Sequence, residues 1–152
     1  MEKDVLTQKF LKGLIKMYEK YAHYLNSGFS DDYWSDFGMF EAADCLSTFT
    51  HVDWDRLAQE VSTQSTGWVE RCAQTLSDVE APQAVSILLM LLSNSNKDVV
   101  EAAADSLNAL ASYGHHIAAT EELKNKLTAA KATAGVLGRL VIESLEKRVL
   151  SK

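Results

Sequence analysis

Apolar and polar residues alternate with helical spacing along most of the chain, most clearly over residues 82–110. This segment, PQAVSILLMLLSNSNKDVVEAAADSLNAL, predicts two short helices joined by the polar turn SNSNKD. The first helix is apolar almost all round, which predicts burial on several sides. The second helix carries one apolar stripe, formed by Val100, Ala103, Ala104, Leu107 and Leu110. The small residues in this stripe allow another helix to approach closely.

The stripe recurs upstream at intervals of 30 and 31 residues. The recurring positions are Met39, Val69 and Val100; Ala43, Ala73 and Ala104; Leu46, Leu76 and Leu107; and Phe49, Val79 and Leu110. A period of this length, built from helix pairs, is typical of an α-solenoid. We therefore predict an all-α fold, a short right-handed α-solenoid of about four helix pairs. It would form a single domain over residues 1–152, with clear repeats over 37–110 and degenerate terminal units at 1–36 and 117–152.

Both ends of the chain also show helical spacing. Residues 3–25 place apolar side chains on one face and lysines on the other, a pattern that favours a solvated outer face over a membrane-bound one. Further along, Asp53 is a candidate N-cap for residues 54–61, and Thr120 for the C-terminal segment. That segment is predicted to form two helices, or one helix bent near Gly135 and Gly138. The apolar spacing of the repeat continues in this segment and predicts a fourth, degenerate unit. The residues at the repeat positions are Ala130, Ala134, Leu137 and Leu140.

Residues 29–40, FSDDYWSDFGMF, combine aromatic side chains with aspartates, and no regular period fits their first half. We interpret this segment as a loop. Its aromatic side chains either cap the core or form an exposed recognition patch, because Trp and Tyr are favoured anchors at protein interfaces. On the second interpretation Trp34, Asp36 and Phe40 contact a partner.

Composition and the cysteines restrict the class of protein. Apolar residues make up 47% of the 152 residues and proline occurs once, which excludes a disordered chain. No apolar run approaches the roughly 20 residues of a membrane span. No signal peptide is evident, so we expect a cytoplasmic protein in which Cys45 and Cys72 are reduced core thiols.

The net charge of −6 is distributed unevenly. Residues 21–123 hold 16 acids against Arg56, Arg71 and Lys97, a net −13, whereas the two ends hold 12 bases and five acids, a net +7. An acidic middle argues against nucleic-acid binding, which needs a basic surface. Two interpretations remain equally open. The acidic segment binds a basic protein partner, or it is a solvated surface that keeps the protein soluble.

Residues 82–110 resemble a HEAT repeat: a proline opens the first helix, Leu91 and Leu92 precede the polar turn, and a Val-x-x-x-Ala-x-x-Leu pattern follows. The resemblance implies HEAT-like helix pairs. HEAT repeats often carry a basic residue after the valine of the second helix, where this chain has Phe40, Glu70 and Glu101, so an inter-repeat Asp–Arg ladder is not expected. Small acidic all-helical chains of this kind also resemble immunity proteins of bacterial polymorphic and contact-dependent toxin systems.

The sequence carries no motif typical of an enzyme or a metal protein. It contains no CxxC, no HExxH and no glycine-rich phosphate loop, and His115 and His116 point to different sides of any helix. We therefore expect no catalytic residue, no metal ligand and no cofactor.

The repeat register predicts a binding stripe across the second helices. Its positions, about 100–140° from the apolar face, carry Phe40 and Asp44, then Glu70 and Gln74, then Glu101 and Asp105. The alternative is that these are ordinary outward positions. The predicted partner contacts are Trp34, Asp36, Phe40, Asp44, Glu70, Gln74, Glu101 and Asp105.

The leading hypothesis is a non-enzymatic inhibitor, an immunity protein that neutralises a cationic toxin such as a nuclease by imitating its phosphate substrate. The alternative is a small HEAT adaptor or assembly factor with no toxin partner. A HEAT-like enzyme or lyase accessory with a tetrapyrrole or nucleotide site is disfavoured, because the stripe lacks cations. We expect a monomer that binds a basic protein, and neither nucleic acid nor membrane.

Overall fold

The computed structural model describes residues 17–26 and 28–150. Every regular element in these ranges is helical and none is a strand, which confirms the predicted all-α class. The chain divides into two compact units, residues 1–69 and 70–152, and each is described by itself. Of the predicted N-terminal helix, residues 17–24 are helical, and residues 3–16 lie outside the described residues.

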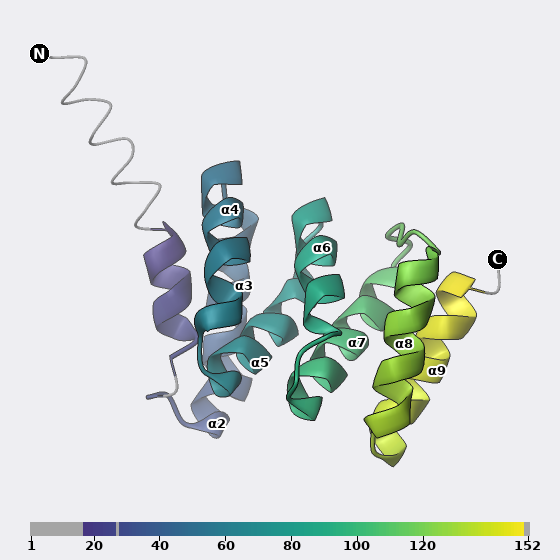
Figure 1. The fold of residues 1–152 in the computed structure, drawn as a ribbon. Coiled ribbons are helices and arrows are strands. Elements are labelled where there is room, and N and C mark those ends of the chain that lie inside the picture. Colours follow the sequence, from purple (N-terminus) through teal and green to yellow (C-terminus); the bar gives the residue numbers. More distant parts are fainter. Residues whose placement is uncertain (1–16, 27, 151–152) are drawn as a thin grey trace, which may run out of the picture. The chain divides into compact units, whose positions relative to one another are not determined.

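The first unit is built around aromatic side chains. After residues 17–24, its elements are α2 (Asp31–Tyr33), the π-helical η1 (Trp34–Gly38), α3 (Met39–Ser47), α4 (His51–Glu60), η2 (Val61–Thr63) and the beginning of α5 (Thr66–Thr75) (Figure 1). The ring of Phe49 lies 5.3 Å from that of Tyr21 and 5.1 Å from that of Trp54, centroid to centroid. The indole N–H of Trp68 donates to the carbonyl of Ala22 at 3.3 Å and so ties α5 to the N-terminal helix.

A capping box begins α4 earlier than the sequence predicted. Thr50 is the N-cap, and its backbone N–H donates to Oδ2 of Asp53 at 3.0 Å. Asp53 therefore occupies the third helical position rather than the cap, and it is buried. The helix starts at His51, because the reciprocal bonds of Thr50 and Asp53 satisfy the free N–H groups of its first turn.

The second unit contains the rest of α5, then η3 (Leu76–Asp78), α6 (Pro82–Leu91), α7 (Lys97–Ser112), α8 (Glu121–Thr133) and α9 (Val136–Leu150). The predicted helical hairpin over 82–110 is confirmed as α6 and α7, which pack against each other (Figure 1). Pro82 occupies the first turn of α6, and Asn96 caps α7 by accepting from the backbone N–H groups of Asp98 and Val99. Gly114 ends α7 with φ of +91°, a conformation that favours glycine.

The C-terminal segment forms two helices, and the predicted fourth echo of the repeat holds for the buried Ala130 but is wrong at Leu137 and Leu140. Leu137 and Leu140 are 73% and 58% exposed. Because α8 ends at Thr133 and α9 begins anew at Val136, the helical phase is reset between them. The buried face of α9, which packs mainly against α7, instead consists of Gly138, Ile142, Leu145 and Val149.

Burial corrects the repeat register by one residue in its first copy. Ala42, Ala73 and Ala104 are all fully buried, and they are spaced 31 residues apart in both steps. Cys45, Leu76 and Leu107 follow the same spacing and are also buried, whereas Met39 and Ala43 are only half-buried. In the second unit the hydroxyl of Ser106 donates to the carbonyl of Ala73 at 2.6 Å, which shows how closely α7 approaches α5 at the alanine positions.

Candidate protein-interaction surface

Most of the segment 29–40 is helical rather than a loop, because the helical run begins at Asp31. Ser30 caps the run by accepting from the backbone N–H of Tyr33 at 3.1 Å, and α2, η1 and α3 then follow without a break over residues 31–47. Within η1 the backbone N–H of Met39 donates to the carbonyl of Trp34, five residues earlier, as in a π-helix. This wider turn accommodates an extra residue, which explains why no 3.6-residue period fitted the sequence.

The side chain of Trp34 points into the first unit. It is 4% exposed, so the expectation that Trp34 is an exposed partner anchor is not met. Gly38 makes room for the indole: a Cβ at this position would lie 3.0 Å from Cε3 of Trp34. Trp34 therefore holds the π turn against the core instead of contacting a partner.

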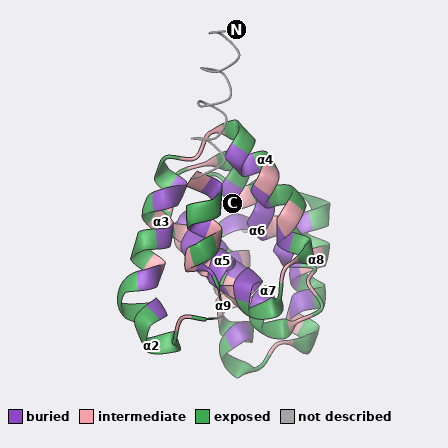
Figure 2. Cartoon of the chain, turned by 90° about the vertical axis from the view of Figure 1, so that its left-hand side faces the viewer, coloured by how far each residue is buried: buried purple, intermediate pink, exposed green. Residues whose placement is uncertain are grey.

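Other aromatic rings of the same helical run face solvent. Tyr33 is 39% exposed, Phe37 61% and Phe40 58%, and we call these three residues the aromatic row. The ring of Tyr33 stacks on that of Phe29 at 4.9 Å and lies 5.8 Å from that of Phe37, centroid to centroid. Exposed residues cover most of α2 and one side of α3 (Figure 2). Large exposed aromatic rings next to each other are typical of a protein-binding surface.

Carboxylates surround the aromatic row, and no basic residue occurs between positions 21 and 55. The exposed acids of this run are Asp31, Asp32, Asp36, Glu41 and Asp44. Among the described residues, no ion pair involves the carboxylate of Asp32, Asp36 or Asp44, whereas Arg56 of the same unit pairs with Glu19 and Glu60. Together these carboxylates give the surface around the row a negative potential.

The corrected register changes the predicted acidic stripe. With 31-residue spacing, Glu70 and Glu101 correspond to Met39, and Gln74 and Asp105 to Ala43, so the first repeat adds no carboxylate to the stripe. Asp36, Phe40, Asp44 and Asp105 are exposed, as predicted. The remaining predicted contacts lie in the second unit and are half-buried, so they are less accessible than predicted: Glu70, Gln74 and Glu101. The predicted contacts therefore concentrate in the 29–44 run.

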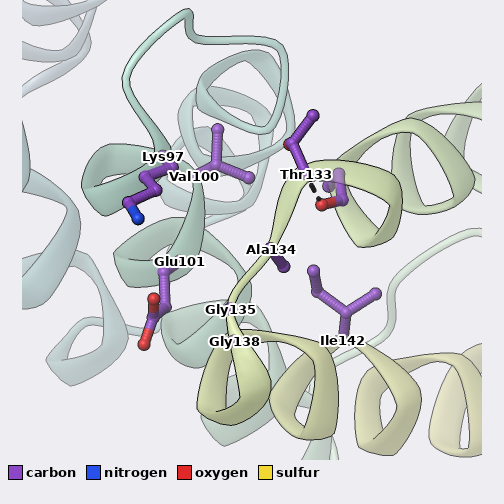
Figure 3. Close-up of a pocket in the computed structure, with 9 residues that line it drawn as sticks. Lys97, Val100, Glu101, Thr133, Ala134, Gly135, Gly138 and Ile142 are labelled. Carbon is purple, nitrogen blue, oxygen red and sulfur yellow. Dashed lines mark hydrogen bonds between the residues drawn. The ribbon is translucent and has the colours of Figure 1, made fainter.

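Glu101 has a local structural neighbour. Its Oε2 would lie 3.1 Å from a Cβ at Gly138, in the first turn of α9 (Figure 3). A carboxylate beside a helix N-terminus interacts favourably with the helix dipole. The pocket around these residues, lined also by Lys97, Thr133 and Gly135, has room for about 10 Å³, the space of about one water molecule. It is too small for a cofactor or substrate.

The first unit holds an arginine, Arg56, between a ring and carboxylates. Cζ of Arg56 lies 4.5 Å from the ring centroid of Tyr18, and Nε lies 3.4 Å from Oε1 of Glu60. Nη1 of Arg56 lies 3.9 Å from Oε1 of Glu19, and the hydroxyl of Tyr18 donates to Oε2 of Glu60 at 2.5 Å. This arrangement shows how rings and acids of this chain hold a guanidinium group.

Sequence reasoning missed Tyr33 and Phe37 as exposed rings. The signal was the four-residue spacing of Phe29, Tyr33 and Phe37, each of the last two directly preceded by an aspartate. Cys45 and Cys72 are buried thiols, as expected, and burial raises the pKa of Cys45. Among the described residues, no cluster of His, Cys, Asp and Glu has the arrangement of a metal site, and no helix has the length and apolar character needed to cross a bilayer.

Comparison with known proteins gave no relative: no protein-family model matches the chain, and neither does any curated protein or solved structure. Function is therefore inferred from the surface itself.

Proposed function

We propose that this protein is a non-enzymatic binding protein that recognises a basic protein surface through the aromatic row and its acidic surroundings. The observation that supports this is the exposure of Tyr33, Phe37 and Phe40 in the same helical run as the exposed carboxylates of Asp32, Asp36 and Asp44. Exposed rings supply apolar contact area that water solvates poorly, and the acids steer a positively charged partner toward them.

The specific form that we propose is an immunity protein that inhibits a cationic toxin, such as a nuclease. A nuclease cleft is basic because it binds phosphate, so a carboxylate-rich surface competes for the same cations. The net charge of −13 over residues 21–123 supports a long-range attraction to such a cleft. Binding there blocks the substrate without any chemistry on the part of the inhibitor.

We also propose that the helix pairs form a short right-handed α-solenoid with HEAT-like repeats. The 31-residue spacing of Ala42, Ala73 and Ala104, all fully buried, supports this proposal. The hydrogen bond from Ser106 to the carbonyl of Ala73 places α7 against α5, as neighbouring second helices of a solenoid require. A crystal structure in which α3, α5 and α7 do not stack as neighbours would exclude the solenoid.

The experiment that tests the function is affinity capture from the source cell lysate with the full-length chain, followed by mass spectrometry. Wild type is compared with the double variant Asp36→Lys/Asp44→Lys and with a control of equal charge change, Asp55→Lys/Glu80→Lys, whose residues are also exposed. We expect wild type and the control to capture the same basic protein, and the Asp36/Asp44 variant to lose it. Equal capture by all three proteins would exclude this surface.

The activity of the captured partner distinguishes the two remaining functions. Inhibition of a nuclease or other toxic activity by stoichiometric amounts of the protein would support the immunity function. A captured basic partner with no toxic activity would make the protein an adaptor.

A further inference from the structure

The aromatic row and its acids form two parallel lines along one helical run. Asp32 precedes Tyr33 and Asp36 precedes Phe37, and the two pairs are four residues apart. Residues four apart are neighbours on a helical surface, and the 5.8 Å distance between the rings of Tyr33 and Phe37 agrees with this. All four residues are exposed, and Asp36, three residues after Tyr33, lies on the same side of the run as that ring, so an incoming side chain can reach the ring and the carboxylate together.

The ring of Phe37 lies tilted by 40° to that of Tyr33. Such a pair offers a flat group two apolar surfaces at an angle, rather than one closed stack. A planar cation fits this arrangement better than a spherical one, because it can lie on one ring while its edge reaches a carboxylate.

The chain contains this chemistry once already, in its own fold. Arg56 lies over the ring of Tyr18 at 4.5 Å while its N–H groups face the carboxylates of Glu60 and Glu19. The aromatic row presents the same two kinds of group at the surface, and among the described residues no ion pair involves Asp32 or Asp36.

Building on the proposed function, we infer that the aromatic row selects arginine over lysine in the basic partner. An arginine guanidinium group is planar and more weakly hydrated than an ammonium group, so it stacks on a ring and still donates two parallel hydrogen bonds to a carboxylate. Lysine satisfies the charge but not the stacking. The partner segment that this surface takes is therefore arginine-rich.

The test uses two fluorescein-labelled peptides of equal length and charge, one with four arginines in a glycine–serine background and one with four lysines at the same places. Binding to the full-length protein is measured by fluorescence anisotropy at low and at physiological salt. We expect the arginine peptide to bind at least about fivefold more tightly, a ratio that persists at physiological salt because stacking is screened less than charge.

Two substitutions assign the preference to the row. Phe37→Leu keeps an apolar side chain but removes the ring, and it should reduce the ratio between the two peptides to about twofold or less. Phe37→Tyr keeps the ring and should preserve the ratio. Tyr113→Leu is the matched control, because Tyr113 is also highly exposed and lies in the second unit.

Failure of this inference and failure of the proposed function give different results. Equal binding of the two peptides, weakened alike by Asp36→Lys/Asp44→Lys, would overturn the arginine preference and leave the acidic binding surface standing. An arginine preference that survives Phe37→Leu and Phe40→Leu would overturn the assignment to the row. Binding of neither peptide would overturn both proposals.

Discussion

The indole of Trp34 occupies the space that a side chain at Gly38 would need. A Cβ there would lie 3.0 Å from Cε3 of the ring, which is tighter than nine in ten real Cβ contacts. Because the π-helical bond joins Trp34 to Met39, the ring, the glycine and the wide turn depend on one another.

Replacing Gly38 with alanine should therefore destabilise the protein. Alanine favours a helix over glycine by about 1 kcal/mol, but overpacking against a buried ring costs about 1–3 kcal/mol, so we expect a net loss of up to about 2 kcal/mol. Gly67→Ala in α5 is the matched control, because nothing lies within 4 Å of its Cβ. Chemical denaturation measures both variants, and a Gly38→Ala protein as stable as Gly67→Ala would contradict the packing described for Trp34.

The alanine positions of the 31-residue register should tolerate no enlargement. Ala104 is fully buried, and α7 is close enough to α5 for the Ser106 hydroxyl to reach the carbonyl of Ala73 at 2.6 Å. Ala104→Leu should lower the free energy of unfolding by about 1–3 kcal/mol. Ala129→Leu, at an exposed position of α8, should change it by less than about 0.5 kcal/mol. Thermal melting of the two variants compares them directly.

Charge reversal should lower stability at Glu101 but not at Asp105, although the sequence predicted that both residues lie on one binding stripe. The carboxylate of Glu101 lies beside Gly138 at the N-terminus of α9, so a lysine there places a positive charge near the positive end of a helix. We expect Glu101→Lys to lower the free energy of unfolding by about 1 kcal/mol. Asp105 is exposed, and Asp105→Lys should change stability by less than about 0.5 kcal/mol. Equal melting temperatures for the two variants would exclude the helix-terminus role of Glu101.

The buried thiol of Cys45 should make the protein less stable at alkaline pH. Burial raises the pKa of Cys45 above its ordinary value of 9.0, and the charge of nearby Lys20 lowers it in part. The unfolded thiol then ionises first, so the folded state holds more protons, and this contribution to stability is lost as pH rises above about 9. Denaturation at pH 8 and pH 10 should show a smaller alkaline loss for Cys45→Ala than for wild type. An identical loss in both proteins would contradict the raised pKa.

Truncation of the aromatic row should affect binding far more than folding. Phe37 and Phe40 are 61% and 58% exposed, so replacing either with alanine should change the free energy of unfolding by less than about 0.5 kcal/mol. If the ring is buried by the basic partner, dissociation should become faster by a factor that corresponds to about 2 kcal/mol. Surface plasmon resonance with the captured partner measures this rate. A normal dissociation rate for both variants would exclude the row as an anchor.

The spacing of apolar residues was sufficient to predict the buried face of helices whose turns are regular throughout. Ala73, Ala104, Leu76 and Leu107 were identified as inward positions because a straight helix repeats its face every three to four residues. In the first copy the same reasoning selected Ala43, one residue away from the buried Ala42.

The features that the sequence did not reveal are those in which backbone bonding changes the phase. At η1 a bond spanning five residues replaces one spanning four, and between α8 and α9 the helix starts again at Val136. Hydrophobic spacing assumes a regular helix, so it cannot detect these changes of phase near Trp34 and Leu137. The segment predicted to bind a partner for this reason overlaps the exposed aromatic row, but the prediction named Trp34 and not Tyr33 or Phe37.

The π turn also has a consequence for how this surface could arise. A helix gains a π turn when a single amino acid is inserted into a regular α-helix. Each residue advances an α-helix by about 100°, so deleting one residue between positions 34 and 38 would restore the regular helix and swing the upstream rings around its axis by about that angle. One inserted codon would thus suffice to turn Tyr33 and Asp32 to a new direction while α3 keeps its buried side. A chain without this residue would also turn Trp34 away from its place beside Gly38, and it would present a different set of side chains to the outside.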